Sequence, residues 1–466
     1  MQSQSVSTIH RERDIVNLGG YLLVATVIAN FFLKVVRLPL PGLSSITLAN
    51  TMAIITFSYI FIRSSLDDEL RRRFLDSFVA LWPAVALCVF AALSTLSAVL
   101  LHRVGGTDVF SRFAQWGYDY QMGILLRFYT AVLGAFIGYI LIKDRATLEK
   151  VMVVLVIGGM LSVGLGYIQI FFGGPYFGPE ELQTQYRLHD QYVVKGFFPR
   201  ENAFGMSMIF LIPFLVAYGF GSRFGIFRPL FLAALVPTFV VTLMAGNRSG
   251  VLASLLAILA LSFLLGQVKK SNSIYLLFLS AILVYAAVKN FESLSMRPEF
   301  IVSSVDAPSL VVRLDMIRVG FLMMLDYPLT GVGAGGYPLF FENYVSSNFV
   351  SSLYVFFSST QEGWSWPHNA FARMAADHGV PGLLMFSAVM VKGYRDFTMG
   401  LRKACGGEER FAIAVFFAVF IGYTLGFQTK DYVQNFDFWI FLGIAAGCRR
   451  WPGGDGARRR PADAGA

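Results

Sequence analysis

Residues 251–265 read VLASLLAILALSFLL, a run of fifteen side chains without a charge. The stretches 238–245 and 275–288 are equally free of charged residues. An α-helix needs about 20 predominantly apolar residues to cross a bilayer, and about a dozen segments of the chain come close to that length and composition. Because such runs offer no polar face to water, they predict helices that cross a membrane.

The composition of the whole chain supports the same interpretation. Of its 466 residues, 56% are hydrophobic and 14% are charged, whereas a soluble globular domain has about 25% charged residues. This excludes a soluble globular protein. The three cysteines show no metal-ligand spacing. Residues 1–17 are polar and no cleavage site follows the first apolar stretch, so we expect that stretch to be retained as an insertion signal.

The apolar segments predict an all-α polytopic membrane protein with about twelve transmembrane helices, formed as a single integral membrane domain over residues 1–466. The predicted spans are 18–36, 46–62, 77–101, 122–142, 151–172, 202–220, 229–245, 251–266, 274–289, 370–391, 411–427 and 436–448.

Lys and Arg residues gather in every second connection between these spans. Together with the two terminal segments, these connections hold 23 of the 38 Lys and Arg residues. Cytoplasmic loops carry the Lys and Arg excess, so we expect both termini in the cytoplasm of a bacterial cell and the protein in its inner membrane. Residues 449–466 are basic and rich in Gly, Pro and Ala, which predicts a disordered cytoplasmic tail.

The connection over residues 290–369, before the tenth span, is predicted to lie on the periplasmic side. About 80 residues are too many for an idle loop. Apolar residues recur in it at helical spacing, at Leu310, Leu314, Ile317, Phe321 and Met324. This period predicts a helix over residues 309–326 that lies along the membrane surface.

Residues 331–336, in the same connection, read GVGAGG and match the dinucleotide pattern G-x-G-x-x-G. That pattern binds nucleotides only between a strand and a helix, on a side of the membrane where nucleotides occur. Here it lies in a periplasmic loop, so we interpret it as a flexible turn.

Arg248 lies in a turn between two apolar spans on the periplasmic side, with no acidic residue nearby in the sequence. Ionisable groups at this depth are costly and usually face a cavity or a partner. Two roles fit the residue: its guanidinium binds an anion from outside the chain, or it extends to lipid headgroups.

Further cations on this face are Lys195, Arg200, Arg313 and Arg318. Arg200 is followed by Glu201, so an internal ion pair is an alternative to ligand binding. Arg318 lies three residues after Asp315, a spacing that favours a salt bridge on the surface of the predicted helix.

His368 and Asn369 follow Pro367 at the point where the long connection re-enters the membrane. The pattern predicts that they cap the helix that begins there. A solvent-accessible histidine titrates near neutral pH and can act as a general base. A polar interfacial role beside Trp366 is the alternative.

Four segments together carry a resemblance to a known family. They read GFFPREN at 196–202, NRSG at 247–250, YPLTGVG at 327–333 within the stretch 313–337, and HN at 368–369 followed by AADHGVPGL at 375–383. In order and spacing they resemble the O-antigen ligase and polymerase superfamily of membrane glycosyltransferases, over roughly residues 195–390. The layout of twelve spans with a late, long periplasmic loop is similar as well.

The resemblance implies a metal-independent, inverting transferase without a cofactor, which takes its glycan from undecaprenyl diphosphate at the periplasmic face. By this resemblance the diphosphate-binding residues are Arg200, Arg248 and Arg313, and the general base is His368. Candidate substrate contacts are Lys195, Arg318 and Asn369. The physical reasoning agrees, because bidentate arginines suit phosphate oxygens and stabilise the charge that grows on the leaving group.

The acceptor separates the functions that remain open. A ligase transfers the glycan to lipid A–core, which is the function we favour, whereas a polymerase extends the repeat unit and a third group modifies protein. The expected partners are the lipid-linked donor, a lipid A–core or glycan acceptor and membrane lipids, and no nucleic acid. A twelve-helix transporter is the alternative from another class; against it, the two halves show no repeat.

Overall fold

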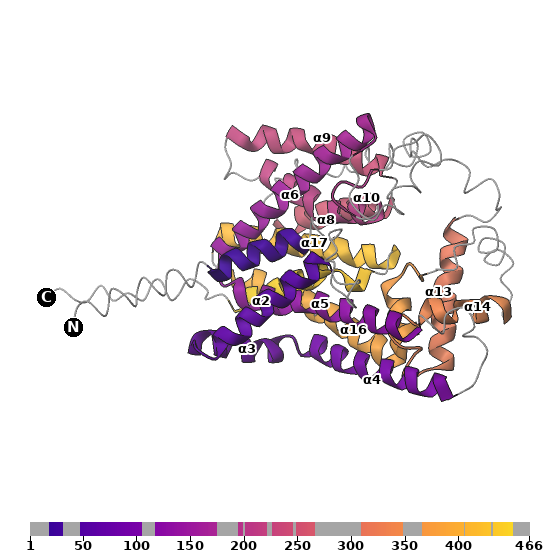
Figure 1. The fold of residues 1–466 in the computed structure, drawn as a ribbon. Helices are drawn as coiled ribbons and strands as arrows, with labels where there is room; N and C mark the ends of the chain where they lie inside the picture. The colour runs from indigo at the N-terminus through magenta and orange to yellow at the C-terminus, as the bar shows by residue number, and fades with distance from the viewer. Residues whose placement is uncertain are drawn as a thin grey trace.

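The structure is a computed structural model that describes residues 18–30, 47–104, 117–174, 194–198, 201–220, 226–245, 248–265, 309–347, 366–404, 406–429 and 432–450. Its elements are helices (Figure 1). After an apolar helix at Leu18–Asn30 they are α2 (Leu48–Ser64), α3 (Asp68–Ala80), α4 (Trp82–Val104), α5 (Gly117–Leu141), α6 (Arg145–Phe172), α8 (Glu201–Phe220), α9 (Arg228–Met244), α10 (Arg248–Leu265), α13 (Ser309–Asp326), α14 (Tyr337–Ser347), α16 (Ala370–Lys403), α17 (Gly407–Thr429), the short 3₁₀ helix η5 (Tyr432–Gln434) and α18 (Phe436–Cys448).

Eleven of the twelve predicted spans coincide with apolar helices of this structure. Five of these helices are long and apolar enough to cross a membrane alone, and six apolar helices are shorter. The remaining predicted span, 274–289, lies outside the described residues. The all-helical class is therefore confirmed for the described residues of this multi-pass membrane protein, while the number twelve and the orientation stay predictions.

Helix α3 is a difference from the prediction, because its residues were assigned to a cytoplasmic connection and to the start of the span 77–101. The Asp67 side chain caps it by accepting from the Glu69 and Leu70 N–H groups. Two ion pairs, Arg71–Asp68 and Arg73–Glu69, lie along its exposed face, and each joins residues about one turn apart. The cap and the ion pairs thus stabilise a helix in this segment. The segment has too many charged residues to be predicted as a transmembrane span.

Helix α16 extends twelve residues past the predicted end of its span and contains a break. Its 34 residues form two helical segments, one on each side of that break. Gly379 has φ 65° within it. There the chain turns aside, and the Val380 N–H donates to Pro328 O at 2.8 Å instead of to its own helix.

Helix α13 has the predicted bounds. In Figure 1 it runs across the direction of α4 and α16 and lies with α14 at one end of the bundle, whereas α3 lies at the opposite end. This direction is the one expected of a helix along the membrane surface. The bundle therefore has two ends of different construction, and the predicted site residues belong to the α13 end.

Candidate functional site

The last turns of α17 are the centre of the α13 end. The Asn369 Nδ2 group donates to Gln428 O at 3.2 Å, which attaches the start of α16 to the end of α17. A Cβ built on Gly422 would lie 2.8 Å from Ile209 Cγ2 and 2.9 Å from Ala253 O. Ile209 belongs to the first half of α8 and Ala253 to the first half of α10. The first halves of α8 and α10 and the start of α16 therefore contact the last third of α17.

Each of these three helices begins at a predicted site residue. Arg248 is the first residue of α10, and α8 begins at the residue after Arg200, which itself lies outside the described residues. His368 lies two residues before the first residue of α16. The start of a helix presents unpaired N–H groups and a partial positive charge, so it attracts anions. Basic side chains there are unfavourable until an anion arrives.

His368 has a backbone conformation that is uncommon in non-glycine residues. Its φ is 48°, and among the described residues it is the one non-glycine residue with a positive φ. Its side chain is partly buried. The following residue, Asn369, is the N-cap of α16, since its Oδ1 accepts from the Ala372 N–H at 2.9 Å. The capping prediction is confirmed for Asn369, and the uncommon conformation of His368 is typical of functional positions.

The two arginines of α13 lie on different faces of that helix. A Cβ on Gly320 would lie 2.9 Å from Ala372 O, so α13 crosses α16 in the first turn after the N-cap. Arg313 lies seven residues, or two turns, before Gly320 on this face and is partly buried. Arg318 is rotated to the opposite face and is exposed. The structure therefore places Arg313 on the face of α13 that contacts α16, two turns before the crossing, and directs Arg318 away from that face.

Lys195 lies in a short segment held against α6. The N–H groups of Lys195 and Gly196 both donate to Gln169 Oε1 at 2.9 Å. Gly196 has φ 54°, which favours glycine, and a Cβ at this position would collide with Ser162 of α6. Lys195 is 2% exposed, so its side chain is an interior group in this structure rather than one facing an open site.

Helix α16 contains a buried ion pair that was not predicted from the sequence. Arg373 Nε lies 3.3 Å from Asp377 Oδ2, and the two residues are 4% and 1% exposed. The Arg373 guanidinium also lies 4.1 Å from the centre of the Trp366 ring. Asp377 further accepts from the N–H groups of Gly335 and Tyr337 at 3.0 and 3.4 Å. Opposite charges four residues apart in an apolar helix were the available signal.

The glycine-rich turn at residues 331–336 docks on this part of α16. All six residues are buried, and three of its glycines have positive φ. The Val332 N–H donates to Ala376 O at 2.9 Å and the Gly333 N–H to Asp377 O at 2.8 Å. The prediction of a turn is confirmed, but its flexibility was wrong, because hydrogen bonds and burial hold the segment.

Hydrogen bonds also connect α14 to α13. The Tyr337 hydroxyl donates to Met316 O at 2.8 Å, and the Tyr344 hydroxyl donates to Asp326 Oδ2 at 2.6 Å. Burial, and then this bond to the Asp326 carboxylate, raise the pKa of Tyr344 well above its ordinary value. The phenol therefore stays protonated and keeps donating. Together with the glycine-rich turn, these bonds make α13, α14 and the start of α16 one unit.

His378 of α16 is a buried residue. Its Nδ1 lies 2.6 Å from Ser94 Oγ of α4, and it is 2% exposed. It therefore connects α4 to α16. In the part of the chain that the structure describes, no group of three or more His, Cys, Asp or Glu side chains is arranged to hold a metal ion.

Comparison with known proteins identifies the family. Residues 233–387 match the family model described as O-antigen ligase, and this region contains α10, α13, α14, the glycine-rich turn and the first half of α16. No curated protein matches the chain. The match implies a membrane enzyme of O-antigen and lipopolysaccharide biosynthesis rather than a transporter. Over residues 233–387 the chain is therefore similar to the O-antigen ligase family of membrane glycosyltransferases.

Proposed function

We propose that this protein is an O-antigen ligase that moves a glycan from undecaprenyl diphosphate to a sugar hydroxyl of lipid A–core at the periplasmic face. The observation that carries the proposal is the convergence of the first halves of α8 and α10 and the start of α16 on the last third of α17. Three helix beginnings next to basic residues form an environment suited to a diphosphate.

In the proposed reaction His368 takes the proton of the acceptor hydroxyl as the hydroxyl oxygen attacks the anomeric carbon of the donor. The bond from that carbon to the diphosphate breaks, and the diphosphate leaves with the electron pair of that bond. Attack from the side opposite to the leaving group inverts the anomeric configuration. The reaction needs neither a metal nor a cofactor, since the energy is stored in the donor.

The arginines have the second role in this proposal. Arg200, Arg248 and Arg313 bind the diphosphate and stabilise the charge that develops on it. The position of Arg313 supports this role, because it lies on the face of α13 that crosses α16 close to His368. Arg318 lies on the other face and is no longer favoured as a substrate contact.

Arg313 and Arg318 provide a matched pair of variants for the test. In a strain that lacks the gene, the wild type is expected to restore ladders of O-antigen on lipopolysaccharide gels. His368→Ala is expected to lower transfer about 10²–10⁴-fold, the usual contribution of a general base. Arg248→Ala and Arg313→Ala are expected to lower it about 10–100-fold, from lost charged hydrogen bonds. Arg318→Ala should behave as wild type. Membrane levels of every variant are measured in parallel.

The form of the product separates ligase from polymerase. A ligase leaves core without O-antigen in the inactive variants while undecaprenyl-linked polymer accumulates. If the wild type instead converts core with one repeat unit into core with many, the protein is a polymerase of the same family. Equal activity of His368→Ala and wild type would remove the proposed base, and equal losses in both α13 variants would remove the assignment of Arg313.

A further inference from the structure

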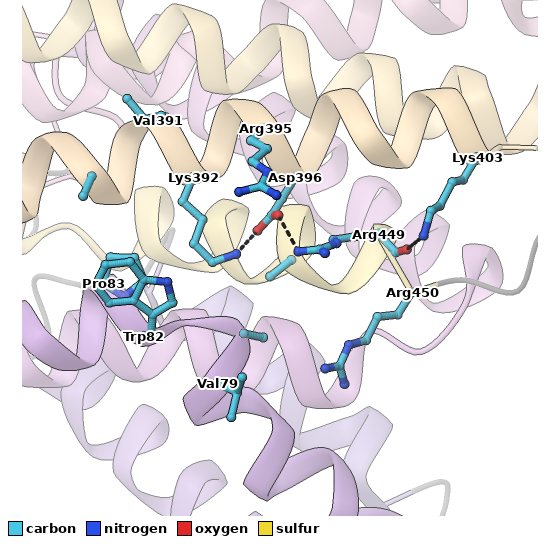
Figure 2. A pocket seen from close by; sticks show the side chains of 13 residues that line it. Val79, Trp82, Pro83, Val391, Lys392, Arg395, Asp396, Lys403, Arg449 and Arg450 are labelled. Atoms are coloured by element: carbon cyan, nitrogen blue, oxygen red, sulfur yellow. Dashed lines mark hydrogen bonds and ion pairs between the residues drawn. The ribbon is translucent and has the colours of Figure 1, made fainter.

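A second cleft lies at the α3 end of the bundle, far along α16 from His368. It has a volume of about 1060 Å³ and lies between the α3–α4 corner, the second half of α16 and the end of α18 (Figure 2). Apolar and charged side chains of these elements line it. The size is typical of a small-molecule site, and it belongs to the end that carries the basic connections.

The charges of this cleft are unbalanced. Five lining residues are cations, namely Lys392, Arg395, Lys403, Arg449 and Arg450, and one, Asp396, is an acid. Asp396 is 1% exposed and accepts from Lys392 Nζ at 2.5 Å, while Arg449 Nη1 lies 3.6 Å from its other oxygen. Arg395 is exposed, and among the described residues no carboxylate pairs with it. Arg450 also pairs with Asp76, which is outside the lining, at 2.8 Å. Two carboxylates therefore face five cations, and the cleft keeps a cationic surface.

Apolar side chains lie beside these cations instead of polar ones. Val79, Trp82 and Val391 line the cleft and are 73%, 59% and 66% exposed. Figure 2 shows Trp82 and Val79 on the α3–α4 side of the cleft and the cations on the α16 and α18 side. A ligand that satisfies both sides carries anionic groups at one end and hydrocarbon at the other.

We propose that this cleft binds an anionic phospholipid of the surrounding membrane. Its phosphate groups contact Arg395 and Arg449, and its acyl chains lie against Trp82 and Val391. The choice of a lipid over a soluble phosphate rests on the apolar wall, which a soluble anion would leave in contact with water. Basic pockets between transmembrane helices at the cytoplasmic side have the chemistry for such headgroups, and tryptophan favours the interface between lipid and water.

Native mass spectrometry of the full-length protein in neutral detergent tests the proposal. The probes are cardiolipin, phosphatidylglycerol and phosphatidylcholine, with inorganic phosphate as a competitor. We expect saturable binding of the two anionic lipids, weaker binding of phosphatidylcholine, and no displacement of lipid by millimolar phosphate. Arg395→Gln is expected to weaken cardiolipin binding about fivefold, and Arg395→Gln with Arg449→Gln about 25-fold, the scale for cations near an anionic surface.

Arg402→Gln is the matched control, because Arg402 is exposed on the same helix but does not line the cleft. It should bind cardiolipin as wild type does, and Arg395→Lys should retain most of the affinity. Equal weakening in Arg395→Gln and Arg402→Gln would mean that general surface charge attracts the lipid, and would overturn the site. Displacement by millimolar phosphate would identify a phosphate site without lipid selectivity, and equal binding of phosphatidylcholine would remove the role of the cations. The readout does not depend on glycan transfer.

Discussion

Helix α16 carries two buried carboxylates, Asp377 near its start and Asp396 near its end, and the structure uses them differently. Each is 1% exposed and each pairs with a cation four residues earlier on the helix, Arg373 and Lys392 respectively. By local sequence the two pairs are equivalent. What differs is the structure that lies opposite each of them.

Asp377 faces backbone. Its two oxygens accept from the N–H groups of Gly335 and Tyr337, and Arg373 is enclosed between it and the Trp366 ring. Every partner is interior, so the carboxylate holds the glycine-rich turn and α14 against α16. Charge-assisted hydrogen bonds to backbone are stronger than neutral ones, which suits an element that fixes a site.

Asp396 faces the cleft. Its Oδ2 accepts from Lys392, but its Oδ1 has no hydrogen bond among the described residues, and the nearby Arg449 is 43% exposed. This carboxylate therefore holds cations at the edge of a cavity rather than joining two segments. The comparison teaches that the same kind of ion pair can connect two segments of the fold or can hold cations at the edge of a cavity. Which of the two it does depends on the structure that packs against it.

The largest expected effect is that of Asp377→Asn. The substitution keeps the volume but leaves Arg373, 4% exposed, without its carboxylate. An uncompensated buried charge costs about 3–5 kcal/mol of unfolding free energy. The measurement is the midpoint of thermal unfolding in detergent. Adding Arg373→Met should recover part of the loss, and a midpoint equal to wild type would show that this pair does not hold the fold.

The next effect is that of Gly379→Ala, which tests the break in α16. At φ 65° an alanine is strained, by about 1–3 kcal/mol, and its Cβ would lie 2.5 Å from Pro328 O. We expect a lower unfolding midpoint and less glycan transfer, since the turn at Pro328 would have to move. Gly164→Ala in α6 is the control, because no atom lies within 4 Å of its Cβ. Equal unfolding midpoints in the two variants would show that the fold does not require the break at Gly379.

The smallest effect is expected for Asp396→Asn. Its partners are partly accessible to water or lipid, with Lys392 16% and Arg449 43% exposed. They can be solvated when the carboxylate is lost, so we expect a cost of about 1 kcal/mol or less in unfolding free energy. The same thermal measurement checks it. A loss of unfolding free energy as large as that of Asp377→Asn would mean that both ion pairs of α16 stabilise the fold equally. It would remove the distinction between them.

Most of the spanning helices could be predicted from the sequence because their signal is local. A run such as residues 251–265 is apolar over its whole length, and the period of residues 309–326 predicted α13 with its observed bounds. Helix α3 was missed because its stability comes from the Asp67 cap and from ion pairs, not from an apolar run. The N-cap at Asn369 is again local chemistry and was predicted.

The candidate site was predictable only in part. The motifs that contain Arg248, Arg313 and His368 were found in the sequence, but their spacing could not show that α8, α10 and the start of α16 converge on the last third of α17. The different faces of Arg313 and Arg318 depended on where α13 crosses α16, at Gly320. Neither arrangement can be predicted from the residues that are adjacent in the sequence.

By itself, then, the sequence determined that this chain is a bundle of membrane helices with basic connections at one end, because apolar runs, caps and charge act over a few residues. The tertiary structure alone decided which of two similar ion pairs holds the glycine-rich turn and α14 against α16. Asp377 accepts hydrogen bonds from the N–H groups of Gly335 and Tyr337, about forty residues earlier in the chain, whereas Asp396 lines a cleft. Such partners are chosen by packing across long sequence separations, which no local pattern encodes.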